Sequence, residues 1–154
     1  IMVEPDAGRE RIAEIVAISD VVKVSDEDLA WLEPGREPLD VAREWATKGP
    51  ALVADTHKSE GSLAVTSGGE HTHVEAPRVN VADTVGAGDS FMGGLIDGLW
   101  SAGLLGADKR QAIGEISSSA LATLLQQSAR IAAITVSRPG ANPPTRLELL
   151  EQTP

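Results

Sequence analysis

Apolar and polar residues follow one another in blocks that predict alternating helices and strands. Residues 8–18 place isoleucine and valine at helical spacing between charged residues, which is typical of an amphipathic helix. Residues 39–47 repeat that pattern, whereas residues 21–24 form a short β-branched run fit for a buried strand. Further strands are expected at residues 51–54, 62–66 and 71–75, with a tight turn at the Gly-Gly pair before the last.

The second half of the chain changes to longer helical segments. Residues 79–81 are expected to be extended, residues 92–105 to form a helix, and residues 109–134 to form one or two more. Residues 135–137 have the pattern of a strand end, and residues 1–5 have that of another. Helices that alternate with short apolar strands predict an α/β architecture with a largely parallel sheet.

Composition narrows the class of protein. The chain has 154 residues, of which 42% are hydrophobic, enough for one domain with a real core. Its formal net charge of -10 repels phosphate backbones and argues against nucleic acid as the main partner. It has no cysteine, no apolar run of membrane-spanning length and no signal-peptide pattern at its first residue. These features predict a cytoplasmic protein without a membrane partner.

The most distinctive chemistry lies in a glycine-rich turn at Gly86, Ala87, Gly88 and Asp89. Two glycines permit positive φ angles and let a ligand approach the backbone closely. A helix that begins there would present unpaired N–H groups and the positive end of its dipole, which together form an anion hole. Asp89 would repel a phosphate but could accept a proton from a neutral hydroxyl. The alternative interpretation is a carboxylate that only caps a helix.

The longer segment Asp83-Thr-Val-Gly-Ala-Gly-Asp-Ser-Phe-Met-Gly-Gly-Leu-Ile96 closely resembles the second signature of the PfkB (ribokinase-type) sugar kinases. It is neither a P-loop nor a dinucleotide fingerprint, because it lacks the Gly-Lys-Ser/Thr ending and its glycines have other intervals. The resemblance implies that Asp89 is the catalytic base and that Gly86, Ala87 and Gly88 form the anion hole. It also implies a ribokinase-like three-layer α/β/α fold with a mainly parallel sheet.

The segment that begins at Asp20 and ends at Leu29 is similar to the family's strand and Asn-x-x-Glu motif, which helps to organise Mg²⁺ and phosphate. Ser25 and Asp28 stand where the family has the amide and the glutamate. A hydroxyl and a shorter carboxylate can still serve a hydrated Mg²⁺ through water. Equally, Ser25 followed by acids reads as a helix N-cap with Asp28 completing a capping box.

The segment from Thr56 to Gly61 stands where the family usually has Thr-x-Gly-x-x-Gly beside the nucleotide. Thr56 and Gly61 are candidate ATP-binding residues. Lys58 replaces the first glycine, where it would either crowd the nucleotide or contact a phosphate. Asp55 is unexpected at the end of an apolar strand.

The last part of the chain resembles the family's adenine-side helix and closing loop. Ser128 is a further candidate for cofactor binding on this helix. In several members the Asp-Thr turn and the closing loop hold a monovalent cation through carbonyl oxygens. The positions that match such a K⁺ site are Asp83, Val85, Thr135 and Gly140. A loop without a cation explains the same residues.

The resemblance extends over nearly the whole chain, always to the C-terminal half of the family. Residues 1–154 are therefore expected to be the ATP-binding and catalytic-base part of a single domain whose N-terminal sugar-binding half and lid are absent. The chain would be a fragment of a longer enzyme, a shortened gene product or part of a longer chain. The implied reaction is ATP-dependent phosphorylation of a sugar hydroxyl with Mg²⁺, and fructokinase-type members are the most similar.

Two rival functions remain open at this point. The first is a truncated, inactive nucleotide-binding or interaction domain, which Lys58 and the missing half favour. The second is a dinucleotide-dependent oxidoreductase, which the glycine spacing disfavours. The small-molecule partners implied by the resemblance are ATP and a sugar, and a homodimer is the assembly that it allows for the full-length protein.

Overall fold

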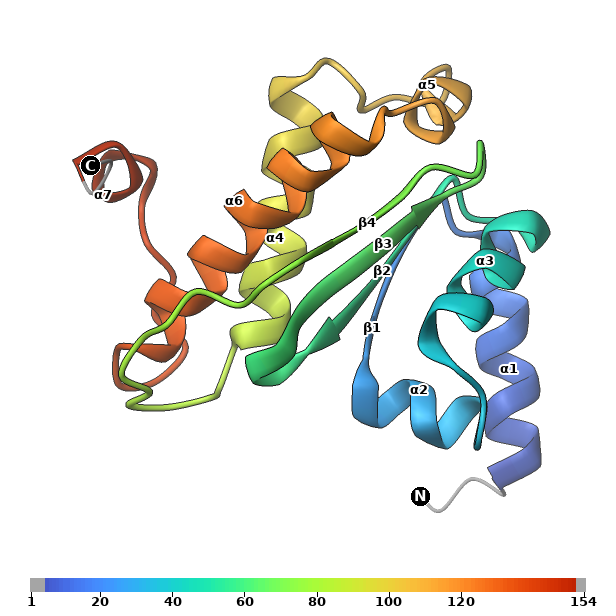
Figure 1. Cartoon of the computed structure of the whole chain (residues 1–154), viewed down its shortest axis with the longest axis horizontal. Coiled ribbons are helices and arrows are strands. Elements are labelled where there is room, and N and C mark those ends of the chain that lie inside the picture. Colours follow the sequence, from blue (N-terminus) through green and yellow to red (C-terminus); the bar gives the residue numbers. More distant parts are fainter. Residues whose placement is uncertain (1–4, 152–154) are drawn as a thin grey trace.

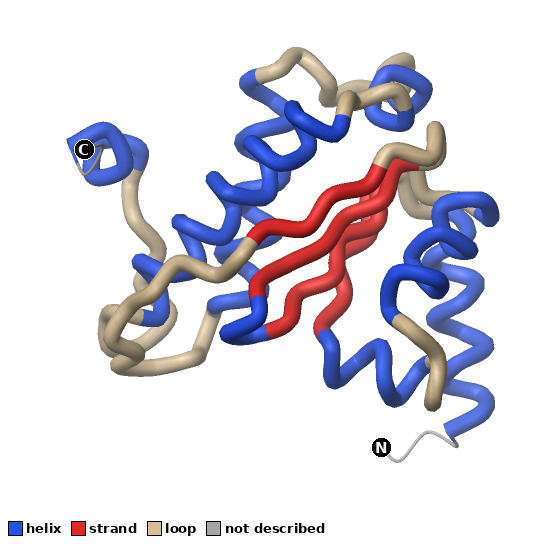
Figure 2. The backbone as a smooth tube through the Cα atoms, viewed as in Figure 1, coloured by secondary structure: helices blue, strands red, loops and turns tan. Residues whose placement is uncertain are grey.

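A four-stranded sheet lies between two layers of helices (Figures 1 and 2). The computed structural model describes residues 5–151. In chain order the elements are α1 (Pro5–Ile18), β1 (Val21–Ser25), α2 (Asp26–Leu32), α3 (Pro38–Lys48), β2 (Leu52–His57), η1 (Lys58–Glu60), β3 (Gly61–Thr66), β4 (His71–Val74), α4 (Ala87–Ser101), α5 (Arg110–Gly114), α6 (Ser118–Val136) and α7 (Arg146–Glu151). The strand end expected at residues 1–5 lies outside the described residues, except for Pro5, which begins α1.

The sheet has the order β1-β2-β3-β4 and is mixed rather than largely parallel. Only β1 and β2 are parallel, and the other two pairings are antiparallel. The reason is the length of the connections, since a parallel pair needs a crossover of a dozen or more residues. Two helices join β1 to β2, whereas the three-residue η1 joins β2 to β3 and a short turn joins β3 to β4. Sequence periodicity does not report this difference.

One face of the sheet packs against α1, α2 and α3. Val41 and Trp45 of α3 lie against Val53 of β2 and Val65 of β3, and all four are buried. The helices form where the amphipathic pattern predicts them, and Pro38 occupies the first turn of α3, where its missing N–H costs nothing.

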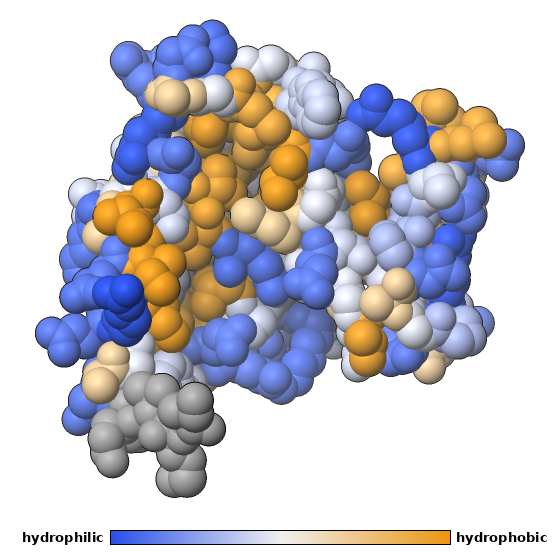
Figure 3. All heavy atoms as spheres, turned by 180° about the vertical axis from the view of Figure 1, so that it is seen from behind, coloured by the Kyte–Doolittle hydropathy of each residue, from blue (hydrophilic) through white to orange (hydrophobic). Residues whose placement is uncertain are grey.

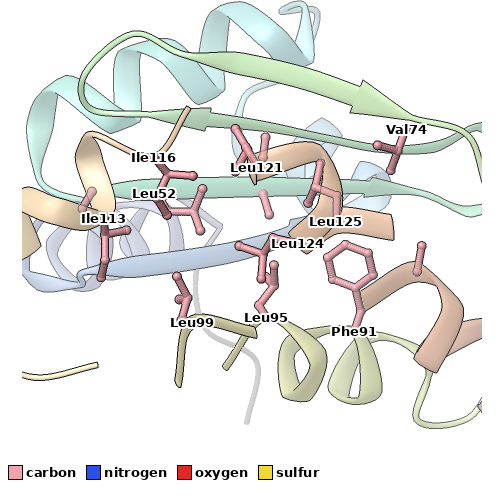
Figure 4. Packing of buried hydrophobic residues seen from close by; sticks show 14 residues of the cluster. Leu52, Val74, Phe91, Leu95, Leu99, Ile113, Ile116, Leu121, Leu124 and Leu125 are labelled. Carbon is pink, nitrogen blue, oxygen red and sulfur yellow. The ribbon is translucent and has the colours of Figure 1, made fainter. Parts of the chain in front are cut away.

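The opposite face packs against α4, α5 and α6, so the expected three-layer arrangement is present. Figure 4 shows leucines of α4 and α6 directed towards Leu52 on the sheet, with Phe91 at one end of the cluster. The two long helices approach closely at Gly94, where an added Cβ would lie 2.7 Å from the Cα of Ser128. This close contact fixes the middle of α4 relative to the middle of α6.

Helix boundaries in the second half of the chain differ from the predicted ones. The helix expected over residues 92–105 begins five residues earlier and ends four residues earlier, because α4 spans Ala87–Ser101. The strand end expected at residues 135–137 is wrong, because α6 continues to Val136. There the hydroxyl of Thr135 donates a hydrogen bond of 2.9 Å to the Ile131 carbonyl oxygen of its own helix. This bond gives the hydroxyl a partner while the β-branched residue stays helical.

The sheet is open at β1, whose outer side is unpaired within residues 5–151. Seen from behind, the molecule carries a broad apolar area (Figure 3). The most exposed large apolar side chains include Ile18 of α1 and Trp100 of α4, at 80% and 73%. None of the helices described between residues 5 and 151 has both the length and the apolarity needed to cross a bilayer.

Candidate functional site

The glycine turn forms the start of α4, as the sequence predicts. Gly86 is the N-cap with φ 79° and ψ 2°, and its carbonyl oxygen accepts a hydrogen bond of 2.9 Å from the amide of Ser90. An added Cβ at Gly86 would lie 2.8 Å from the Cβ of Ala141. Both the left-handed backbone and the contact with the closing loop therefore require glycine at this position.

The amides of Gly88 and Asp89 donate no hydrogen bond within the described part of the chain. Both lie in the first turn of a fifteen-residue helix, where the dipole adds positive charge. The Asp89 side chain is exposed and pairs with no cation among residues 5–151. The turn thus combines free N–H groups with a free carboxylate.

A surface hollow of about 500 Å³ borders Asp89. Gly93 and Asp97 continue its wall along α4, and Pro143 and Arg146 form part of the opposite wall. Arg146 forms an ion pair with Asp97 at 2.5 Å. A small neutral molecule therefore has room beside the Asp89 carboxylate.

Asp83 ties the glycine turn to the closing loop. Its Oδ1 accepts a hydrogen bond of 3.0 Å from the Val85 amide, and its Oδ2 accepts one of 2.9 Å from the Gly140 amide. These bonds hold the pKa of the Asp83 carboxyl below its usual range. Three of the four residues proposed for a cation site, Asp83, Val85 and Gly140, are therefore neighbours.

The fourth residue of that set, Thr135, is fully buried in α6. Its hydroxyl forms a hydrogen bond of 2.9 Å with the hydroxyl of Ser90, and its carbonyl oxygen accepts the Arg138 amide. The candidate Ser128 is also fully buried, with its hydroxyl donating to the Leu124 carbonyl oxygen. Ser128 therefore contributes to the α4–α6 contact and does not face an open surface.

Ser25 and Asp28 form the helix cap that the sequence allows. The Ser25 hydroxyl oxygen accepts the Asp28 amide at 3.2 Å, and the two side chains are hydrogen-bonded at 2.6 Å. Asp28 is exposed. Ser25 pairs with Thr56 in the parallel part of the sheet, so both lie at the carboxyl ends of β1 and β2. Across the described part of the chain, no three His, Asp or Glu side chains converge on a metal position.

The turn from β2 to β3 departs from the glycine-rich pattern expected there. Lys58 has a left-handed backbone with φ 38°, and its ammonium forms an ion pair with Glu27 of α2. This contact raises the pKa of Lys58. Gly61 has φ 110°, and an added Cβ would overlap the carbonyl oxygen of Val74. Gly61 is thus required by the packing of β4, and Thr56 is half-buried with its hydroxyl 3.3 Å from the Val24 carbonyl oxygen.

Asp55 is fully buried on the face of the sheet that carries α2 and α3. Nε2 of His57 lies 2.8 Å from its Oδ2, but neither carboxylate oxygen has a well-directed hydrogen bond within residues 5–151. Burial raises the pKa of Asp55, His57 offsets part of the rise, and Asp26 adds to it. Asp55 lies under α2 and away from the start of α4.

Lys23 is a site residue that the sequence did not single out. It belongs to β1, and its Nζ lies 2.8 Å from the point that a Cβ on Gly88 would occupy. The carboxyl ends of β1 and β2 and the start of α4 therefore meet at one end of the molecule, the lower end in Figure 1. The available signal was a single charge within the Val-Val-Lys-Val run.

Comparisons with known proteins show the family and the fold. The sequence matches the profile of the pfkB family carbohydrate kinases over residues 1–147. It is 42% identical over 101 residues to a fructokinase from Rhizobium leguminosarum bv. trifolii, a match that covers 66% of this chain and 30% of the relative.

Two solved structures share the fold. The aminoimidazole riboside kinase from Salmonella enterica, in complex with aminoimidazole riboside and an ATP analog, has a TM-score of 0.70 and 29% identity, over 90% of this chain and 43% of that chain. A fructokinase double mutant from Vibrio cholerae O395, with fructose, ADP and a potassium ion, has a TM-score of 0.70 and 25% identity, over 90% and 41%. The fold is ribokinase-like, and the chain spans less than half the length of these relatives.

Proposed function

Because the chain belongs to the pfkB family of carbohydrate kinases, we propose that it supplies the nucleotide-binding and proton-accepting part of an ATP-dependent sugar kinase. The observation that carries this proposal is the start of α4, where two free amides lie beside a free carboxylate. A fructose-type acceptor is favoured because a fructokinase is 42% identical over the matched residues.

The first turn of α4 binds the phosphoryl group that is being transferred. Negative charge grows on its oxygens during transfer, and the amides of Gly88 and Asp89 are already oriented towards that position by the helix. Gly86 keeps these amides in place, since its left-handed backbone and its contact with Ala141 fix the entrance of the helix.

Asp89 acts as general base. It accepts the proton of the sugar hydroxyl while the hydroxyl oxygen bonds to the γ-phosphorus and the bond from phosphorus to the leaving oxygen of ADP breaks. Its exposure to the adjoining hollow lets a neutral acceptor approach, and general-base assistance of this kind contributes ~10²–10⁴ in rate.

The residues present fit a nucleotide phosphate, because Gly88 carries no side chain that would cover the two free N–H groups. When bound, Mg·ATP supplies the phosphoryl group and the metal charge that offsets its oxygens. Since the described residues offer no three-ligand metal set, Asp28 would contact Mg²⁺ through water, with Ser25 orienting the carboxylate. Thr56 and Gly61 border the nucleotide, and Ser128 has no part in the proposal.

A monovalent cation fits the junction between the glycine turn and the closing loop. Carbonyl oxygens of Asp83, Val85 and Gly140 would be its ligands, and the Asp83 carboxylate holds the two segments together. What supports this part is the neighbourhood of those residues and the potassium ion in the solved fructokinase.

The decisive experiment replaces Asp89 with asparagine in the natural protein at full length. We expect phosphoryl transfer to fall at least ~10²-fold while the Kd for ATP stays within a few-fold of its original value. Asp40→Asn is the matched control, because Asp40 is also an exposed carboxylate in the first turn of a helix but lies on the other side of the sheet. Turnover that survives in Asp89→Asn would remove Asp89 from this role.

A nucleotide-binding domain without catalysis is the second candidate. It is favoured by the left-handed Lys58, held by Glu27 where the family expects glycine. Tight ATP binding with no phosphorylation of any sugar by the full-length protein would support it over the kinase.

A further inference from the structure

Lys23 differs from the other lysines in having no acidic partner. The chain has four lysines. Lys48 pairs with Glu44, Lys58 with Glu27 and Lys109 with Asp108. Within residues 5–151 no carboxylate pairs with Lys23, although acids outnumber bases by ten over the whole chain. An ammonium group left unpaired in such an acidic protein needs an explanation.

Lys23 lies on the face of the sheet that packs against α4. Side chains alternate between the two faces of a strand. Val22 and Val24 pack with α1–α3, whereas Val21 packs with α4–α6, so Lys23 is directed to the α4 side. Lys23 is half-buried. Placing a charge there without a partner opposes folding, because its hydration is reduced without compensation.

The ammonium group ends at the anion hole. Its Nζ occupies the space 2.8 Å from where a side chain on Gly88 would begin. Gly88 does not have the positive φ that marks Gly86, so its backbone would accept alanine. What glycine provides at this position is therefore space, shared by the lysine side chain and the free amides of Gly88 and Asp89.

We propose that Lys23 binds the terminal phosphate of the nucleoside triphosphate and keeps this contact in the transition state. This role deepens the kinase function proposed above and rests on it. The amides, the helix dipole and the ammonium group all favour negative charge at one point. The Lys23 charge also offsets the repulsion between that phosphate and the Asp89 carboxylate. The same chemistry would fit the phosphate of a phosphorylated sugar. The nucleotide phosphate is preferred as the ligand, because the proposed function already assigns it to the free amides at the start of α4.

The test uses Lys23→Met and Lys23→Arg in the full-length natural protein, with Lys48→Met as the matched control. Equilibrium binding is measured for ATP, ADP, adenosine and fructose 6-phosphate. We expect Lys23→Met to weaken ATP binding by ~10–100-fold, ADP binding by less, and adenosine binding by under 2-fold. Lys23→Arg should recover part of the ATP affinity, and Lys48→Met should change none of the four.

The outcomes separate this proposal from the kinase proposal. Unchanged ATP affinity in Lys23→Met, or an equal loss for adenosine, overturns the role of Lys23 while leaving the kinase intact. A loss confined to fructose 6-phosphate also overturns it, since the lysine would then bind the acceptor. If the unaltered full-length protein binds neither ATP nor adenosine, the proposed function itself fails.

A second readout does not depend on ligand affinity. Acylation of Lys23 by an amine-reactive ester, followed by peptide mass spectrometry, should slow at least ~5-fold with saturating ATP and stay unchanged with adenosine. Lys48 should react at the same rate throughout. Equal protection of Lys23 by adenosine would contradict direct contact with a phosphate.

Discussion

The two turns at the proposed nucleotide site differ in how far they keep the features expected of them. The turn that begins α4 has both glycines, two free amides and a free carboxylate. The turn between β2 and β3 keeps Gly61 but has Lys58 in place of a glycine, and charged or polar groups at Asp55 and His57 on the strand before it.

The difference shows where the function is least tolerant of change. Backbone amides at a helix start can bind a phosphate only if the backbone is free of side chains, as at Gly88. In the β2–β3 turn, by contrast, the Lys58 ammonium forms an ion pair with Glu27 of α2. We therefore expect changes at the α4 turn to affect phosphoryl transfer and changes at the β2–β3 turn to affect stability.

The largest effect is expected from alanine at the two glycines with positive φ. Gly61→Ala should lower the unfolding free energy by about 3 kcal/mol or more, because its Cβ would overlap the backbone of β4. Gly86→Ala should cost about 1–3 kcal/mol and also abolish most turnover. Denaturant unfolding and kinase assays measure both.

Gly35→Ala serves as the control for that pair, since Gly35 also has positive φ but no atom within 4 Å of an added Cβ. Its loss of stability should therefore be the smallest of the three. If Gly61→Ala abolished phosphoryl transfer without loss of stability, the proposed division between the two turns would be wrong.

A smaller, pH-dependent effect is expected from Asp55→Asn. Burial raises the pKa of Asp55 above its value in the unfolded chain, so the folded state holds this proton more tightly. The carboxyl opposes folding least below its unfolded pKa, and its cost grows as pH rises through the raised folded pKa. Asp55→Asn should thus stabilise the protein by about 1–2 kcal/mol at pH 7, with less gain near pH 4.

Chemical denaturation between pH 4 and pH 8 measures that gain, with the exposed Asp40→Asn as control. His57 and Asp26 are the titratable groups that influence Asp55, and His57→Asn should enlarge the gain at neutral pH by removing the nearest partner. A gain that is constant over the whole range would contradict the raised pKa.

The smallest effect is expected from Lys58→Gly. Glycine relieves the left-handed backbone at φ 38° while the exposed pair with Glu27 is lost, so Tm should change by no more than about 2 °C. ATP affinity should change by less than ~3-fold, in contrast to Lys23→Met. A loss of ATP affinity as large as that of Lys23→Met would show that both turns bind phosphate.

Local signals predicted one part of this molecule well. Gly-Ala-Gly-Asp indicated a turn that leads into a helix, although α4 begins at Ala87 and not at residue 92, and the Ser25 cap follows from a serine before acids. The end of α6 was missed, since β-branched Ile134, Thr135 and Val136 favour a strand until packing against α4 fixes the helix.

Features that depend on long-range contact were beyond the sequence. The mixed sheet follows from two short connections whose direction only the paired strands reveal. The meeting of Lys23 with Gly88 joins residues 65 positions apart, and the burial of Ser128 depends on the close contact with Gly94. Each required the helices to be placed on the sheet.

The central claim is that free amides at the start of α4 bind the phosphoryl group in transit, and amide chemical shifts test it most directly. In ¹⁵N-labelled full-length protein, ADP with magnesium and aluminium fluoride would imitate the transferring phosphate. We expect the amide resonances of residues 88 and 89 to shift most, in the unaltered protein and in Asp89→Asn, while that of Gly35 stays in place. Unmoved resonances of Gly88 and Asp89 with nucleotide bound would contradict it.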